Sequence, residues 1–284
     1  LEAEGVRVRR PEPVDHLRSF GTPDWQVTSG FCAANPRDVF LVIGSEIIEA
    51  PMADRSRYFE GFAYRELMKE YFRGGARWTA APKPRLLDAL YAHDYRLPGP
   101  GEPLRFTVSE HEPVFDAAEF VRCGRDLFTQ KSHVTNDAGI AWLARHLGDD
   151  YRIHLLETQD PHAIHLDSTF IPLAPGKVMV NPKYLDLRRL PKVLEKWEIL
   201  AAPPEAPTDP RDRGLLSEWI HLNVLSLDSK RVIVERSQQP LIDALRRWGF
   251  EPIPCSFVGF YPFVGSLHCA TLDIRRRGEL ESYF

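Results

Sequence analysis

Length, composition and charge exclude several classes of protein. The chain has 284 residues, 43% of them hydrophobic, which is enough to bury a substantial core in one large domain or two ordinary ones. A net charge of -4 and a pI near 6.2 provide no basic field of the kind that nucleic acid or anionic lipid requires, so we expect neither as a partner. No apolar run approaches the roughly 18 residues of a membrane helix, so no membrane partner is predicted.

The cysteines indicate a reducing environment. They lie at positions 32, 123, 255 and 269, show no CxxC spacing and are too sparse for a disulfide framework. Because the N-terminus also lacks a signal-peptide pattern, we expect a cytoplasmic protein. We interpret Cys32, Cys123 and Cys255 as structural thiols. Cys269 begins an alternating strand pattern beside a turn, where a thiol fits either a nucleophile or an inert core residue.

A pattern of helix end, short turn and strand recurs along the chain. At the N-terminus, the tail of a helix stops at Gly5 before an expected strand, so the chain is expected to begin in mid-element. Further helices are predicted from apolar periodicity and capping residues over 60–72, 135–147, 190–196 and 240–248. Each is followed by an expected strand, at 77–80, 151–155, 197–200 and 251–254. The pattern therefore occurs in five copies.

Extended pairs lie between these copies. They are predicted at 38–43 with 47–48, 116–121 with 126–129, 164–173 with 178–180, and 219–227 with 231–235. A fifth pair shows only one strand, at 269–275, whose partner would have to precede Leu1. We therefore expect an α/β fold in which five β/α units form one domain over residues 1–284. The units form a closed ring whose closing strand belongs to a missing N-terminal segment, or else the ring is open at that edge.

Polar side chains recur at the beginning of the first strand of each pair. Unit by unit they are Asp38, Asp116, His165 with Asp167, the neighbourhood of Ser217 to His221, and Cys269. In a ring, equivalent positions converge on the axis, and residues two apart on a strand share a face. Two carboxylates, an imidazole with a carboxylate, and a thiol are therefore expected to share one pocket.

Each of these residues also has a simpler interpretation. Asp38 follows Asn35 to Arg37 and could cap a turn. His165 could be a satisfied core histidine, and Asp167 a surface residue. Asp116 is harder to explain in this way, because a carboxylate in an apolar context needs a cation or hydrogen-bond donors.

The same stretches resemble the amidinotransferase family, which includes glycine amidinotransferase and the inosamine-phosphate amidinotransferases. The matching runs lie at 47–53, 55–60, 78–84, 112–118, 165–169 and 268–276, in family order along the chain. The resemblance implies a fivefold pseudosymmetric β/α-propeller of ββαβ units, the pentein-type fold. It also implies an N-terminal segment, including the first strand, ahead of the point where this chain begins.

The resemblance also assigns roles by position. The family's nucleophile falls on Cys269, its acid/base histidine on His165 and its catalytic aspartate on Asp116. Asp38 and Asp167 match further carboxylates that contact substrate, and Ser217 matches a serine near the donor. Asp167 is expected to orient the imidazole or to help bind the guanidino group.

Two positions depart from the family pattern. Tyr184 stands where the family usually has an arginine that clamps the carboxylate of the donor, and Arg188 or Arg189 is the expected substitute. The run 263–267 replaces the usual glycines before the nucleophile. Both departures lie where substrates would be recognised, so donor geometry and acceptor identity stay open.

The resemblance implies transfer of the amidino group of L-arginine, or a related guanidino donor, to an acceptor amine through an amidino-cysteine, in secondary-metabolite biosynthesis. Carboxylates would hold the guanidinium, and the bound cation would favour the thiolate. We expect small-molecule substrates only, no cofactor and no metal, because neither ligand spacing nor a phosphate-binding glycine motif is present. A homodimer is a further hypothesis. The alternatives are a guanidine-hydrolysing deiminase-type enzyme and a catalytically defective homologue that binds guanidino ligands.

Overall fold

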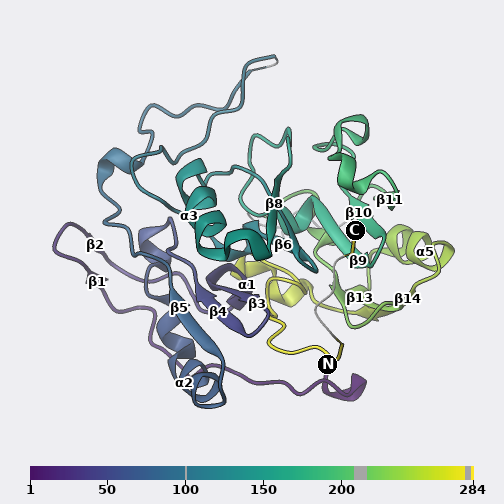
Figure 1. Ribbon diagram of the computed structural model, residues 1–284, viewed down its shortest axis with the longest axis horizontal. Coiled ribbons are helices and arrows are strands. Elements are labelled where there is room, and N and C mark those ends of the chain that lie inside the picture. Colours follow the sequence, from purple (N-terminus) through teal and green to yellow (C-terminus); the bar gives the residue numbers. More distant parts are fainter. Residues whose placement is uncertain (100, 208–215, 279–282) are drawn as a thin grey trace.

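Four three-stranded sheets follow one another along the described part of the chain. The computed structural model describes residues 1–99, 101–207, 216–278 and 283–284 (Figure 1). In each sheet an antiparallel pair is followed by a third strand parallel to the second. The sheets are β3 (Phe40–Ile43), β4 (Glu46–Glu49) and β5 (Arg77–Ala80); β6 (Val121–Cys123), β7 (Asp126–Thr129) and β8 (Arg152–Leu155); β9 (Phe170–Ala174), β10 (Lys177–Val180) and β11 (Glu198–Ala201); and β12 (Leu225–Ser226), β13 (Arg231–Glu235) and β14 (Glu251–Cys255).

Helices connect the second and third strands in three of these sheets. They are α2 (Arg65–Arg73), which follows the 3-10 turn η3 (Glu60–Tyr64), α3 (Asp137–Leu147) and α5 (Gln239–Arg247). The helix predicted over 190–196 is wrong, because only the 3-10 turns η8 (Leu187–Arg189) and η9 (Lys192–Leu194) form there. Pro191 disfavours a helical conformation at Leu190, which is extended.

Two residues of opposite charge stand in register at the start of every pair of parallel strands. On the second and third strands, the residues in register are Glu46 and Arg77, Asp126 and Arg152, Lys177 and Glu198, and Arg231 and Glu251. The first three pairs form ion pairs at 2.5, 2.9 and 3.3 Å. A slip of one residue would separate these partners and turn each strand's apolar side chains away from the core. These ion pairs therefore favour the same strand register in the first three sheets.

The hydrophobic core runs from each sheet to the next. One cluster joins β3 and β4 to β7 and α3, a second joins β7 to β9 and β10, and a third joins β9 and β10 to β13 and α5. The C-terminal segment completes this circuit, because Leu267 packs against the fourth sheet while Leu272 and Ile274 pack against the cluster of the first sheet. Figure 1 shows this yellow segment between β3 and β13.

The strand predicted at 269–275 is wrong. Residues 267–270 form a turn, and no strand of the described ranges pairs with the residues after it. Strand backbone groups need hydrogen-bonding partners, and here arginine side chains bind carbonyls instead. Arg37 donates to the carbonyl oxygen of His268 at 2.8 Å, and Arg276 donates to those of Ser226 and Leu227 at 2.6 and 3.0 Å. The segment thereby connects the first and fourth sheets without forming a strand.

The N-terminal residues follow the prediction in part. The 3-10 turn η1 (Glu2–Glu4) stops at Gly5, whose φ of 79° is the left-handed conformation that favours glycine. The strand expected after Gly5 does not form, and the first described strands are β1 (Phe20–Gly21) and β2 (Gln26–Val27), which make a small hairpin. Within the ranges described, no helix combines the length and apolar character needed to cross a membrane.

Candidate active site

A short helical turn precedes the first strand of each sheet. These turns are α1 (Pro36–Val39), η5 (Ala117–Glu119), η7 (Leu166–Ser168) and η10 (Ile220–Leu222). Asp38, Asp116, His165 and Asp167 lie in or directly before these turns rather than at the beginning of the strands, whereas Cys269 lies in a separate turn over 267–270. A helical turn closes its own backbone hydrogen bonds and needs no neighbouring strand, which explains the difference. The turns contact one another, η5 with α1 and η7, and η7 with η10, so the turns of neighbouring sheets lie together.

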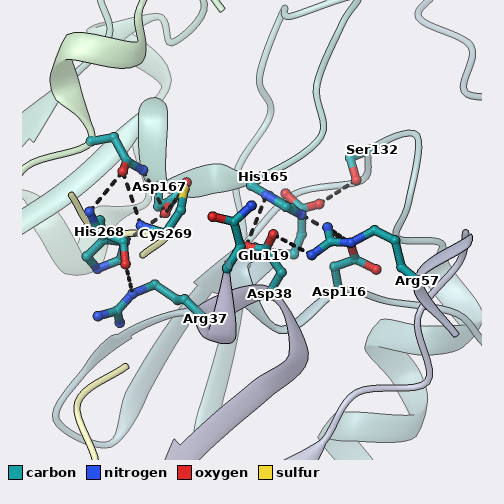
Figure 2. A network of polar contacts seen from close by, with 12 residues as sticks. Arg37, Asp38, Arg57, Asp116, Glu119, Ser132, His165, Asp167, His268 and Cys269 are labelled. Carbon is teal, nitrogen blue, oxygen red and sulfur yellow. Dashed lines mark hydrogen bonds and ion pairs between the residues drawn. The ribbon is translucent and has the colours of Figure 1, made fainter. Parts of the chain in front are cut away.

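His165 lies between two carboxylates, as Figure 2 shows. Its Nε2 is 3.2 Å from Asp116 Oδ2 and its Nδ1 is 3.5 Å from Asp38 Oδ1. Burial lowers the pKa of His165, but the charge of Asp38 and the hydrogen bond to Asp116 outweigh it and raise the pKa to about 10. The imidazole is therefore an imidazolium at neutral pH.

Arg57 is a largely buried cation of the site that the sequence pattern does not indicate. It ends the 3-10 turn η2 (Arg55–Arg57), and its Nη2 lies 2.9 Å from Asp38 Oδ2. Its Nη1 is 3.5 Å from Asp116 Oδ2, and Glu60 accepts two further hydrogen bonds, at 2.9 and 3.0 Å. The sequence contains one signal for this pair, because Arg57 stands three residues before Glu60. This spacing places both side chains on one face of a helical turn. Arg57 and His165 thus contact the same two aspartates.

Asp167 links the nucleophile candidate to a second histidine. Its Oδ2 accepts hydrogen bonds from His268 Nδ1 at 2.7 Å and Asn223 Nδ2 at 2.9 Å, and it lies 3.7 Å from Cys269 Sγ. The imidazole that Asp167 contacts is therefore that of His268 and not that of His165. Burial raises the pKa of Asp167, but the hydrogen bond from His268 and the positive charges nearby together outweigh it and lower the pKa. His268 was visible in the sequence as the neighbour of Cys269 but was given no role.

Cys269 is buried and its backbone is fixed by an amide. Asn223 Oδ1 accepts the N–H groups of both His268, at 2.9 Å, and Cys269, at 3.2 Å. Burial, followed by the charges of Asp167 and Asp38, raises the pKa of the thiol well above its usual value. In this structure Cys269 is thus a thiol rather than a thiolate. Asn223 had no motif that would have identified it from the sequence.

Glu119 supports the turn that positions Asp116. Its carboxyl group is fully buried and accepts hydrogen bonds from Ser132 Oγ and from Gln130 Nε2, the latter at 2.9 Å. Thr158 Oγ donates in turn to Gln130 Oε1 at 2.7 Å. Burial raises the pKa of Glu119 to about 8. This network joins η5 to the segment between β8 and His165.

Two predicted residues lie in a more exposed cluster. Ser217 is exposed and its Oγ accepts the N–H of Trp219 at 3.1 Å. Lys183 Nζ lies 5.1 Å from the centre of the Tyr184 ring and 2.9 Å from Glu218, the neighbour of Ser217. Lys183 therefore connects the segment of Tyr184 to the segment of Ser217.

The arginines proposed to replace the missing clamp are exposed, and each is paired with an acid. Arg188 pairs with Asp186 at 2.9 Å, and Arg189 pairs with Glu157. Lys183 is therefore the cation that directly accompanies Tyr184.

Sequence similarity now identifies the family. No protein-family model matches the chain. The chain is 50% identical over 283 residues to the L-arginine:L-lysine amidinotransferase of Pseudomonas savastanoi pv. phaseolicola, which covers 100% of this chain and 77% of the relative. The chain belongs to the amidinotransferase family.

Solved structures agree with this assignment. The amidinotransferase superposes on SxtG, an amidinotransferase from Microseira wollei in the saxitoxin biosynthetic pathway, with a TM-score of 0.96 and 64% identity, covering 100% of this chain and 79% of that one. The inosamine-phosphate amidinotransferase StrB1 from Streptomyces griseus gives a TM-score of 0.88 at 40% identity, with coverage of 99% and 79%. The resemblance read from the sequence is therefore confirmed.

A more distant likeness concerns the fold alone. The N-terminal domain of ArgZ, an arginine dihydrolase from cyanobacteria, matches the amidinotransferase with a TM-score of 0.59 at 16% identity, covering 87% of this chain and 77% of that one. The predicted pentein-type α/β fold is thus confirmed, and the segment around Cys269 packs against the first and fourth sheets.

Proposed function

We propose that this amidinotransferase moves the amidino group of L-arginine, or of a related guanidino donor, to Cys269 and then to an acceptor amine. The observation that supports this best is the burial of one thiol in a cluster where acids outnumber cations. Asp38, Asp116 and Asp167 face the thiol and His165, while Arg57 is already paired with Glu60 as well. Such a site attracts a planar cation, and a guanidinium offers N–H groups to several carboxylates at once.

The bound cation would also activate the thiol. Acidic neighbours and burial keep the pKa of Cys269 high in the unliganded protein. A guanidinium between Asp38 and Asp167 would offset their charge and stabilise the thiolate, so that activation depends on substrate. The Sγ–H proton would then leave to solvent, because the pKa of Asp167, which lies 3.7 Å from Sγ, is lowered and its carboxylate is a poor base.

His165 is then the acid of the first half-reaction. Sγ attacks the guanidinium carbon, the bond from this carbon to the side-chain nitrogen of the donor breaks, and the departing amine takes a proton from the imidazolium of His165. The acceptor amine next attacks the amidino-cysteine and gives a proton to His165. The C–S bond breaks, and the released thiolate takes up a proton from solvent when the product leaves. The pKa of about 10 supports the acid role, because His165 is protonated before the donor arrives.

The acceptor is proposed to be a primary amine of natural-product biosynthesis. The SxtG relative belongs to saxitoxin biosynthesis, and the bacterial relative is named for lysine as well as arginine. Lys183 and Tyr184, next to Glu218, form a polar exposed cluster that would suit a charged end of a substrate.

The decisive experiment uses Cys269→Ala, with Cys255→Ala as a matched control because Cys255 is a half-buried thiol outside the cluster. Wild-type protein and Cys255→Ala, incubated with arginine alone, are expected to gain the mass of one amidino group and to release ornithine. Cys269→Ala is expected to do neither. Full transfer by Cys269→Ala would refute the proposal.

The same assay separates the alternatives. Arginine with a panel of amines should yield ornithine and a new guanidino compound with ping-pong kinetics. Citrulline and ammonia as products would indicate the hydrolase. Arginine binding without either product would indicate a binding protein, and both outcomes contradict amidino transfer.

A further inference from the structure

Asn35 has a buried oxygen that the fold does not use. The residue is 1% exposed and immediately precedes Pro36, the first residue of α1. Asparagine at such a position usually accepts a hydrogen bond from the first turn of the helix, but here the side chain makes no such bond. Its Nδ2 donates instead to the carbonyl oxygen of Phe263 at 2.8 Å. Among the residues that the structure describes, none donates a hydrogen bond to Asn35 Oδ1.

This oxygen lies beside the nucleophile. Gly265 shows the proximity, because a Cβ atom added there would meet Asn35 Oδ1 at 2.6 Å and Cys269 Cβ at 2.9 Å. Asn35 Oδ1 and Cys269 therefore flank the same point of the backbone. The segment 263–267, which departs from the glycines of the family, is thus held between the amide of Asn35 and the nucleophile.

A second unused oxygen comes from the same helical turn. Asp38 Oδ1 is buried and, within the described ranges, accepts no hydrogen bond, although His165 Nδ1 lies 3.5 Å away. A buried acceptor without a donor is unfavourable, and a native protein keeps one where a ligand supplies the donor. Two such oxygens, one turn apart and next to a thiol, match the N–H groups of a planar guanidinium.

We propose that Asn35 Oδ1 accepts an N–H group of the donor's guanidino group, beside Asp38. The same side chain fixes Phe263 through Nδ2, so the loop before Cys269 and the guanidino group share one anchor. A neutral amide suits this place, because another carboxylate would oppose formation of the thiolate that Asp38 and Asp167 already disfavour. This inference rests on the proposed function, since it assigns a binding residue for the same donor.

The test measures binding in the Cys269→Ala background, where no turnover occurs. Asn35→Leu removes both the acceptor and the donor of the amide, whereas Asn35→Asp removes only the donor to Phe263. Both variants therefore lose the anchor of the loop, and only Asn35→Asp keeps an oxygen for the guanidinium. Calorimetric titration with L-arginine is compared with titration by L-ornithine, which has the same carboxylate and α-amine but no guanidino group.

We expect Asn35→Leu to weaken arginine binding roughly 10- to 100-fold, the effect of losing one hydrogen bond to a charged group. Asn35→Asp should bind arginine at least as tightly as the parent, and ornithine should bind the parent and Asn35→Leu within about twofold of each other. Equal weakening of arginine binding by both variants, or no weakening by Asn35→Leu, would overturn the inference. Asn35→Ala, which is smaller and also removes both the acceptor and the donor, replaces Asn35→Leu if the leucine variant is not folded by circular dichroism.

Failure of the proposed function would look different. In that case the Cys269→Ala parent would not bind arginine, or the wild-type protein would bind it without transferring an amidino group to an amine. Failure of the Asn35 proposal leaves both of these activities intact and removes only the difference between the leucine and aspartate variants.

Discussion

The two ends of the buried cluster each contain a histidine, an aspartate and an arginine, yet their electrostatics differ. At one end, His165 lies between Asp38 and Asp116, and its pKa is raised to about 10. At the other end, burial and the nearby charge of Arg37 lower the pKa of His268, although it is hydrogen-bonded to Asp167. The carboxylates around His165 overcome the effect of burial, whereas at His268 the charge of Arg37 adds to that effect and the carboxylates do not compensate for it. The pairing of a histidine with an aspartate therefore does not by itself determine its charge.

The arginines at the two ends also differ in the number of acids that they contact. Arg57 is 11% exposed and contacts three acids, whereas Arg37, at 14% exposure, contacts Asp273 and the carbonyl oxygen of His268. The end with His165 is therefore a compact charge cluster, which is suited to binding a cation and supplying a proton. The end with Cys269 is organised by backbone hydrogen bonds to Asn223 and Arg37, which fix the position of the thiol.

The largest expected effects are on kcat, when each of the two histidines is replaced. His165→Asn should lower kcat about 10²- to 10⁴-fold, because the departing amine loses its general acid. His268→Asn keeps a side chain that can donate to Asp167 and should lower kcat only about tenfold, a cost typical of one misplaced hydrogen bond. Steady-state kinetics with arginine and an acceptor amine checks both values. Equal losses in the two variants would contradict the assignment of separate roles.

A smaller effect is expected on stability when each of the two arginines is replaced. Arg57→Met should lower the free energy of unfolding by about 3–5 kcal/mol, because three buried carboxyl groups lose their shared cation. Arg37→Met should cost less, about 1–3 kcal/mol, since Asp273 is partly exposed and is also paired with Arg276 at 2.8 Å. Urea unfolding followed by circular dichroism measures both. The comparison fails if Arg37→Met proves the more destabilising substitution.

The smallest effect is a pH dependence of opposite sign at the two histidines. The pKa of His165 is raised on folding, so its stabilisation is fully present below about 6.5 and is lost as pH rises through about 10. The pKa of His268 is lowered on folding, so its contribution is present above about 6.5 and is lost as pH falls below that value. The stability difference between wild type and His165→Asn should therefore shrink at alkaline pH. The stability difference between wild type and His268→Asn should shrink at acid pH. Unfolding experiments across pH measure both differences, and parallel stability curves for wild type and the variants would refute both assignments.

The repeated pattern of helix, glycine and strand was sufficient to predict most elements of the fold. Four of the five pairs of extended segments form sheets, because alternating apolar residues and turns between them are local signals. The strand at 269–275 was predicted from the same alternation and is absent, since a strand also needs a neighbour that the local pattern does not reveal. The family resemblance placed Cys269, His165, Asp116, Asp38 and Asp167 at the site, and the structure brings all five into one buried cluster.

The residues that sequence reasoning missed act through long-range contacts. Arg57, Asn223 and Asn35 are ordinary surface-type residues in a sequence, and each becomes informative only when its buried partners are known. Ser217 and Tyr184, by contrast, were predicted from position alone and lie in a more exposed cluster with Lys183.

The sequence by itself determined the family, the order of the units and the identity of the chemical groups, because residue type and spacing are properties of the chain. The tertiary structure decided which histidine is charged, which arginine shares the aspartates, and which buried oxygens are left without a donor. These depend on distances between segments far apart in the chain. Charge interactions and hydrogen bonds change steeply over a few ångströms, a scale that spacing along the sequence does not specify.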